Sequence, residues 1–110
     1  MTPMTKLYII DENGEKFFGE GPYRLLIAIR ENGSLRAAAS DMQMAYTKAL
    51  KLIKSAERAL GYSLIERQKG GKDGGSSRLT KSAEALIEKY TVYRERCHSA
   101  CADIFADIFG

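Results

Sequence analysis

The spacing of hydrophobic positions changes several times along the chain, and each change marks a new predicted element. Residues 6–10 and 15–18 are two short apolar-rich runs that predict the strands of a β-hairpin. Residues 11–14 lie between them and end in Asn13-Gly14, a strong signal for a tight turn. Because an isolated hairpin is not stable in water, we expect it to pack on the helices that follow.

Helical spacing begins after residues 19–22, which end the hairpin. Proline is well tolerated in a first helical turn, so a helix is predicted from Pro22 to about Asn32. Its buried side should carry Tyr23, Leu26, Ile27 and Ile29. Gly33 suits the left-handed residue that ends a helix, and the Ser34 hydroxyl is expected to cap the next one. That second helix should turn Leu35, Ala38 and Ala39 inward.

A longer helix is predicted from Ala45 to Leu60, after a corner at residues 42–45. Its apolar positions repeat at helical spacing and should face the core: Ala49, Leu52 or Ile53, Ala56 and Leu60. Residues 63–68 and 76–79 then predict two strands joined by a glycine-rich tip at residues 69–75. This tip lacks the Gly-Lys-Ser/Thr ending of a phosphate-binding P-loop, so we interpret it as a hairpin tip.

Two helices joined by a tight corner and followed by a hairpin form a helix-turn-helix with a wing, a shape that places one helix in the DNA major groove. The expected fold is therefore mainly α with a small β content. It comprises an N-terminal β-hairpin, a three-helix core, a two-stranded wing and a long C-terminal helix. We expect residues 1–80 to form the winged helix-turn-helix domain and residues 81–110 to form a dimerisation helix.

The last predicted helix, capped by Thr80, carries apolar residues at spacings of three and four almost to its end. About four of its turns extend beyond what a small core can cover, and such a seam normally packs on a partner. We therefore expect a homodimer; the alternative is a helix folded back along its own domain. The seam residues are Leu86, Tyr90, Tyr93, Cys97, Cys101, Ile104 and Ile108.

Composition adds a charge argument to this pattern. The 110 residues suffice for one domain, and 45% of them are apolar, as is ordinary for a globular protein. The net charge is +3, but residues 41–80 alone carry eight basic and four acidic side chains. This positive excess falls on the long helix and the wing, where phosphate contacts would be needed. The alternative interpretation is a solvated, lysine-rich helix face.

Several classes of protein are not indicated. No apolar run approaches the ~20 residues that span a bilayer, and the N-terminus does not resemble a signal peptide. Two cysteines without an export signal indicate free thiols and a cytoplasmic location. Cys97 and Cys101 share a helix face while His98 points elsewhere, so we interpret the thiols as packing residues and expect no metal or cofactor. The alternative is that four thiols gather at the seam of a dimer and bind a soft metal or sense oxidation. A single histidine and no nucleophile motif argue against an enzyme.

A family resemblance rests on six short segments. They are Phe18-Gly19-x-Gly21-Pro22, Gly33-Ser34-Leu35-x-Ala37-Ala38-Ala39, Leu60-Gly61, Leu64-Ile65-Glu66-Arg67, the glycine-rich tip at residues 70–75, and Arg78-Leu79-Thr80. Together they resemble the winged helix-turn-helix of LysR-type regulators and, more closely, the N-terminal domain of molybdate-responsive ModE-type regulators. The resemblance covers about residues 6–93. It implies a DNA-binding transcription regulator that acts as a dimer on a palindromic site.

The chain departs from this family pattern in two ways. Gln43 stands where the corner usually has glycine, and Ala45 stands where a serine cap is usual. Gln43 is therefore expected to adopt a left-handed backbone at some cost. The C-terminal molybdate-binding domains and the LysR-type effector domains have no counterpart in these 110 residues. Oxyanion sensing is therefore not carried over, any effector is unknown, and we expect a stand-alone DNA-binding form rather than a fragment.

The predicted contacts with double-stranded DNA follow from placing the long helix in the major groove. Tyr46, Thr47 and Lys48 are expected at base edges, Lys51 at bases or phosphates, and Lys54 at phosphates. Further backbone contacts are expected from Ser34 and Arg36 before this helix, and from Lys69 and Lys72 on the wing, which can also reach the minor groove.

Alternatives remain for some of these residues. Tyr46 can instead pack against the first helix, and Arg67 and Arg78 can pair with Glu66 or Asp73. The rival function is a winged-helix module that binds another protein and no DNA.

Overall fold

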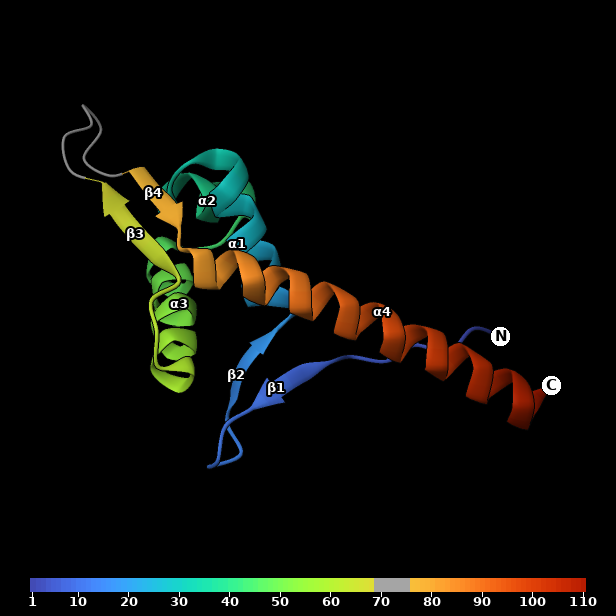
Figure 1. Cartoon of the computed structure of the whole chain (residues 1–110). Coiled ribbons are helices and arrows are strands. Elements are labelled where there is room, and N and C mark those ends of the chain that lie inside the picture. The colour runs from blue at the N-terminus through green and yellow to red at the C-terminus, as the bar shows by residue number, and fades with distance from the viewer. Residues whose placement is uncertain (69–75) are drawn as a thin grey trace.

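The computed structural model describes residues 1–68 and 76–110, and Figure 1 shows how their elements are arranged. In chain order these elements are β1 (Tyr8–Ile10), β2 (Lys16–Gly19), α1 (Glu20–Asn32), α2 (Leu35–Asp41), α3 (Tyr46–Leu60), β3 (Ile65–Gln68), β4 (Ser76–Leu79) and α4 (Lys81–Phe109). The strands form two antiparallel pairs, β1 with β2 and β3 with β4. The predicted fold class, mainly α with two small hairpins, is confirmed.

The N-terminal hairpin turns where the sequence predicted. The Asp11 carboxylate accepts hydrogen bonds from the backbone N–H groups of Asn13 and Glu15 at 2.8 and 3.0 Å, and Gly14 has a positive φ of 81°. Phe18, only 2% exposed, attaches the hairpin to the core. The helix α1 follows β2 directly, so it begins at Glu20, two residues before the predicted start at Pro22.

The core lies where α1, α2 and α3 meet. Leu25, Leu26 and Ile29 of α1 are fully buried, and Ile53 of α3 is 1% exposed. Alanines at the α1–α2–α3 contacts are buried as well, because a small side chain lets two helix backbones approach closely. The burial of Leu25 was not predicted, and Ile27, which was expected on the buried side, is only partly buried and packs against the core.

The helices begin and end at the capping residues that the sequence predicted. The Ser34 hydroxyl accepts a hydrogen bond from the Ala37 N–H at 3.0 Å, and the Thr80 hydroxyl accepts one from the Ala83 N–H at 3.0 Å. Gly33 and Gly61 end α1 and α3 with left-handed φ values of 79° and 82°. These local signals set the lengths of the helices.

The corner between α2 and α3 carries the backbone strain that the sequence indicated. Gln43 has a φ of 55°. Among residues 1–68 and 76–110, no other residue except glycine has a positive φ. The next residue, Met44, donates its N–H to the Ala39 carbonyl at 2.8 Å, so the corner is closed by a backbone hydrogen bond. Ala45 precedes α3 without a side-chain cap. Both departures from the family pattern are therefore expressed in the structure.

We expect Gln43→Gly to raise the free energy of unfolding by about 0.5 kcal/mol, because glycine adopts a left-handed backbone without the Cβ penalty but loses more chain entropy on folding. The Gln43 side chain is exposed, so its removal sacrifices little packing. Thermal denaturation measures the effect, with Gln43→Ala as the control that keeps the strained backbone. A glycine variant no more stable than the alanine variant contradicts the prediction.

Helix α4 has an anchored part and a projecting part (Figure 1). Ala83, Ile87 and Tyr90 are buried in the core, and Leu86 packs against it. Beyond them the helix runs away from the body, and Ile104 and Ile108 are 58% and 69% exposed. Among the described residues, no helix is apolar over a stretch long enough to cross a membrane.

Candidate nucleic-acid interface

Helix α3 presents one buried face and one charged face. Ala49, Ile53 and Ala56 are at most 1% exposed and hold the helix against the core. The exposed face carries Thr47, Lys48, Lys51, Lys54 and Arg58. Of the α3 side chains predicted to contact DNA, Thr47, Lys48, Lys51 and Lys54 are thus at the surface, whereas Tyr46 is partly buried.

Tyr46, at the start of α3, lies between two guanidinium groups. The Arg36 guanidinium, from α2, is 4.3 Å from the centre of the Tyr46 ring. Arg67 of β3 donates a hydrogen bond from Nη2 to the Tyr46 hydroxyl at 3.1 Å. Tyr46 is partly buried against the core, and it holds two cations beside the N-terminus of α3.

Arg67 is a candidate residue whose role the sequence did not find. The sequence left it as a possible ion-pair partner of Glu66 or Asp73. Asp73 lies outside the described residues, and no Arg67–Glu66 ion pair is found in residues 1–68 and 76–110. The two side chains point to opposite faces because they are neighbours on the strand β3. The contact between Arg67 and Tyr46 joins residues that are 21 positions apart, which periodicity cannot reveal.

The base of the wing is tied to the helices by hydrogen bonds. The Glu57 carboxylate of α3 accepts the Leu64 N–H at 2.8 Å, just before β3. Ser77 of β4 donates its N–H to the Gly33 carbonyl at 2.8 Å, at the junction of α1 and α2. These contacts hold β3 and β4 in a defined position relative to α3. The wing lysines Lys69 and Lys72 lie outside the described residues.

Ser34 and Arg36 lie at the beginning of α2, Ser34 as its N-cap and Arg36 in its first turn. The Ser34 hydroxyl oxygen accepts the cap hydrogen bond from the Ala37 N–H, so the hydroxyl hydrogen is still free to be donated to an acceptor such as a phosphate oxygen. Arg36 is exposed, with its guanidinium on the Tyr46 ring. Arg36 therefore lies beside Tyr46 at the start of α3, while Ser34 caps α2.

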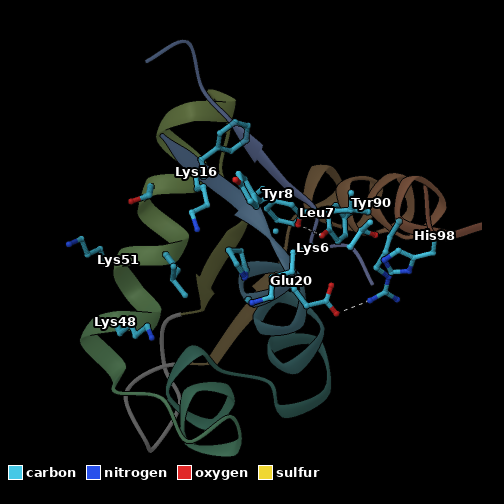
Figure 2. Close-up of a pocket in the computed structure, with 18 residues that line it drawn as sticks. Lys6, Leu7, Tyr8, Lys16, Glu20, Lys48, Lys51, Tyr90 and His98 are labelled. Atoms are coloured by element: carbon cyan, nitrogen blue, oxygen red, sulfur yellow. Dashed lines mark hydrogen bonds and ion pairs between the residues drawn. The ribbon is translucent and has the colours of Figure 1, made fainter. Parts of the chain in front are cut away.

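Lys48 and Lys51 also line a hollow of about 770 Å³ on the side of α3 that faces the N-terminal hairpin (Figure 2). Its other walls come from the start of α1 and the middle of α4, which contributes Arg94 and His98. The sequence did not indicate this hollow, because its walls come from five separate elements: β1, β2, α1, α3 and α4.

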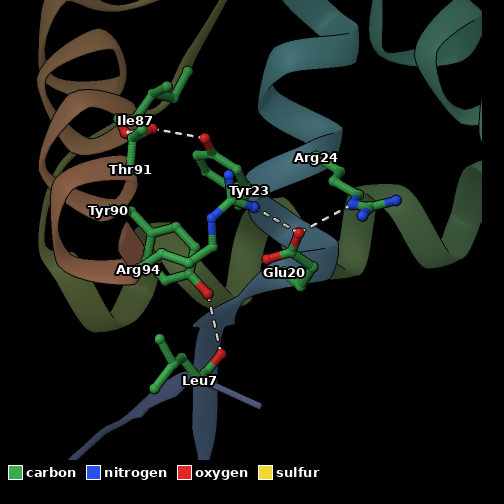
Figure 3. Close-up of polar contacts among 8 residues, drawn as sticks. All are labelled: Leu7, Glu20, Tyr23, Arg24, Ile87, Tyr90, Thr91 and Arg94. Atoms are coloured by element: carbon green, nitrogen blue, oxygen red, sulfur yellow. Dashed lines mark hydrogen bonds and ion pairs between the residues drawn. The ribbon is translucent and has the colours of Figure 1, made fainter. Parts of the chain in front are cut away.

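The direction of α4 is set by polar contacts at its middle (Figure 3). The Tyr90 hydroxyl donates to the Leu7 carbonyl at 3.0 Å, and the Tyr23 and Thr91 hydroxyls lie 2.6 Å apart. The Glu20 carboxylate accepts hydrogen bonds from Arg94 at 2.8 Å and from Arg24 at 3.1 Å. These contacts fix α4 to α1 and to the hairpin.

Tyr90, predicted in the dimer seam, belongs to the core of its own chain. It is 2% exposed, and its ring packs edge-on against Phe18 with a centroid separation of 5.2 Å. Leu86 is also turned toward the core. The helical spacing correctly identified an apolar face on α4. This face runs from the core into the projecting part of the helix, and its exposed portion begins at Tyr93. A partner could therefore pack only from Tyr93 onward.

We expect Tyr90→Phe to destabilise the fold by about 1 kcal/mol near neutral pH, because the hydrogen bond to Leu7 is lost. Burial, helped by the nearby Glu20 charge, raises the pKa of the Tyr90 phenol above its ordinary value of 10.0. The unfolded state then releases this proton first, so the stabilisation is present below pH 10 and is lost as the pH rises through the folded pKa. Thermal melts between pH 8 and about pH 11 should show the two proteins converging; a constant difference contradicts this account.

The two cysteines lie one turn apart on the projecting part of α4. Both Cys97 and Cys101 are free thiols and partly exposed. Among the residues that the structure describes, no group of three or more histidine, cysteine, aspartate or glutamate side chains is arranged to hold a metal ion.

Comparison with known proteins shows that residues 22–84 match a family described as "Bacterial regulatory helix-turn-helix protein, lysR family". The molybdenum transport protein ModE of Herbaspirillum seropedicae is 36% identical over 91 residues, which are 83% of this chain and 31% of that protein. The transcriptional regulator ModE of Haemophilus influenzae is 36% identical over 67 residues, 61% of this chain and 26% of that protein. The chain thus spans about a third or less of the length of these relatives.

Solved structures show the same fold. The crystal structure of a CbnR_DBD–DNA complex has a TM-score of 0.61 at 23% identity, covering 79% of this chain and 94% of that one. The crystal structure of CbnR, a LysR family transcriptional regulator, has a TM-score of 0.56 at 24% identity, covering 73% of this chain and 26% of that one.

Proposed function

Because this chain belongs to the lysR family of bacterial regulatory helix-turn-helix proteins, we propose that it binds a palindromic site on double-stranded DNA as a homodimer and regulates transcription in the cytoplasm. The family match and the ModE relatives confirm the resemblance found in the sequence. The matched family is one of regulators, in agreement with the expectation that the chain is no enzyme.

The observation that carries the proposal is the charged outer face of α3, opposite the buried residues that fix this helix. In the proposed complex α3 enters the major groove, where residues near the N-terminus of a recognition helix contact base edges. A lysine such as Lys48 can donate to guanine O6 and N7, and the Thr47 methyl can contact a thymine methyl. Tyr46 completes the base-contacting set, while Lys51 and Lys54 serve bases or phosphates further along.

Phosphate contacts are proposed on both sides of this helix. Ser34 and Arg36 lie at the start of α2, and Arg67 is held by Tyr46 on the other side. The wing lysines Lys69 and Lys72 are proposed to contact the backbone or the adjacent minor groove. What supports this arrangement is the set of hydrogen bonds that ties the wing base to α1 and α3. One of the matched structures is itself a complex of CbnR_DBD with DNA.

A second copy is proposed to pack on the projecting part of α4, so that residues 1–80 form the DNA-binding domain and residues 81–110 the dimerisation helix. Large apolar side chains are exposed there in a single chain, and burying them stabilises a helix pair. The proposed seam comprises Tyr93, Cys97, Cys101, Ile104 and Ile108. Two joined recognition helices should read half-sites about 34 Å apart, one turn of DNA.

Selection of bound DNA from a random pool, at a stated salt concentration, tests this function. We expect a two-fold symmetric consensus with half-sites one helical turn apart. A single asymmetric site contradicts the homodimer and leaves DNA binding in place. No enrichment at any salt concentration contradicts DNA binding and favours the rival function, a protein-interaction module.

A further inference from the structure

The hollow beside α3 has an aromatic lining (Figure 2). It holds about 770 Å³ and lies between β1 and β2, the start of α1, α3 and the middle of α4. Phe17, Phe18 and Tyr90 contribute to its apolar walls, and Tyr8 stands at the hairpin side. Its volume falls within the range of about 300–1,000 Å³ that is typical of sites for small organic ligands.

The charges around this hollow are mostly positive. Its lining holds one carboxylate, Glu20, and five permanent cations: Lys6, Lys16, Lys48, Lys51 and Arg94. The excess of four exceeds the net charge of +3 of the whole chain. The Glu20 carboxylate is already hydrogen-bonded to two arginines, so little of its charge is left to oppose an anion.

In the described part of the chain, the four lysines have no such carboxylate partner. Within residues 1–68 and 76–110, none of their ammonium groups lies within 4.0 Å of a carboxylate. The Lys16 ammonium rests 4.8 Å from the centre of the Tyr8 ring, an arrangement that holds the cation at the hairpin wall. Lys48 and Lys51 of α3 also line this hollow.

We propose that this hollow is a binding site for a small organic anion, with an apolar body against the aromatic walls and an anionic head among Lys16, Lys48 and Lys51. Burial of the apolar body would provide affinity, and the lysines would select for charge. A neutral ligand, or an apolar helix from a second copy, would bring the lysines out of water without pairing them, which is costly.

Binding here would compete with DNA, because Lys48 and Lys51 belong both to the hollow and to the proposed DNA-reading face. This competition rests on the proposed function, whereas anion binding does not. A ligand would thus control DNA binding from within the same 110 residues.

Two fluorescent probes test the site directly: the anion 8-anilino-1-naphthalenesulfonate and its uncharged relative N-phenyl-1-naphthylamine. We expect the anion to bind one site per chain, at least tenfold more tightly than the uncharged probe. Two-dimensional NMR should place the anion at Phe17 and Lys16. Lys16→Ala should weaken anion binding about five- to tenfold and leave the uncharged probe unaffected. Lys89→Ala, which removes an exposed lysine of α4 outside the hollow, is the matched control.

The results that overturn the site are equally defined. Equal affinity for both probes, or an unchanged affinity of a Lys16→Ala variant with an unaltered melting temperature, would show that the hollow does not select an anion. NMR shifts confined to residues 101–108, beyond the hollow, would show the same. Shifts at Phe17 that appear on raising the protein concentration, without probe, would assign the hollow to a second copy instead.

The competition has its own measurement. A saturating concentration of the anionic probe should lower the affinity of the parent chain for its selected DNA about tenfold. The same probe concentration should lower the DNA affinity of the Lys16→Ala variant by a smaller factor. Anion binding at the hollow without any effect on DNA affinity would reject the competition and retain the site. Failure of the chain to bind DNA at all would reject the proposed function and leave the probe titration as the test of the site.

Discussion

Replacing Lys51 with glutamate should lower the affinity of this protein for its selected DNA site about 100-fold. Lys51 is exposed in the middle of the charged face of α3, opposite the buried Ile53 side. The substitution removes one charge-assisted contact and places a carboxylate against the DNA, and these effects together are worth about two factors of ten. Fluorescence anisotropy over a range of salt concentrations should also show the salt slope falling by about one unit.

Lys89→Glu is the matched control for this change. It alters the net charge equally, but on an exposed position of α4 outside the charged face of α3. We expect it to reduce DNA affinity only slightly, through the weaker long-range field. If both variants lose the same affinity, the effect comes from net charge and the assignment of α3 as the recognition helix is wrong.

Ile108→Asp should convert the protein to a monomer and lower its affinity for a two-half-site DNA about 100-fold, because the second half-site is then no longer bound at high effective concentration. Ile108 is 69% exposed in the single chain and lies far along α4 from the core, so the fold itself should melt as before. Analytical ultracentrifugation measures the oligomeric state, and anisotropy with one or two half-sites measures the loss.

Val92→Asp provides the same chemical change on the other side of the same helix. Val92 is 49% exposed, and at 100° per residue it lies about 160° around the helix from Ile108. We expect this variant to remain dimeric with nearly unchanged DNA affinity. A dimer that survives Ile108→Asp, or one that is lost equally with Val92→Asp, contradicts the proposed seam.

The position of the proposed seam relative to the helix-turn-helix depends on how α4 is held. Tyr90, Arg94 and Thr91 attach it to the hairpin and to α1, so the direction of the proposed dimer helix is transmitted to the helix-turn-helix by defined contacts. Because α1 carries Glu20 and Tyr23 of this junction and also packs against α2, a shift of α4 would be felt at the start of α3. In the proposed dimer, the spacing of the half-sites would therefore depend on this junction as well as on the seam.

Local chemistry determined the order, type and ends of the elements. Asn13-Gly14 predicted the hairpin turn, Ser34 and Thr80 predicted helix caps, and Gly33 predicted a helix end, because each signal acts on the backbone within a few residues. The strained Gln43 corner was likewise predictable from the missing glycine. The sequence alone was therefore sufficient for the winged helix-turn-helix and for the lysines of α3.

Only the tertiary structure decided where separate elements meet. It placed Tyr90 in the core, joined Arg67 to Tyr46, and brought the hairpin lysines to the hollow beside Lys48 and Lys51. Periodicity shows which residues share a face of one element. It does not show how far along α4 the core covers that face, or which elements face one another across the hollow. Those facts depend on how several elements pack together, and no single stretch of the chain contains that information.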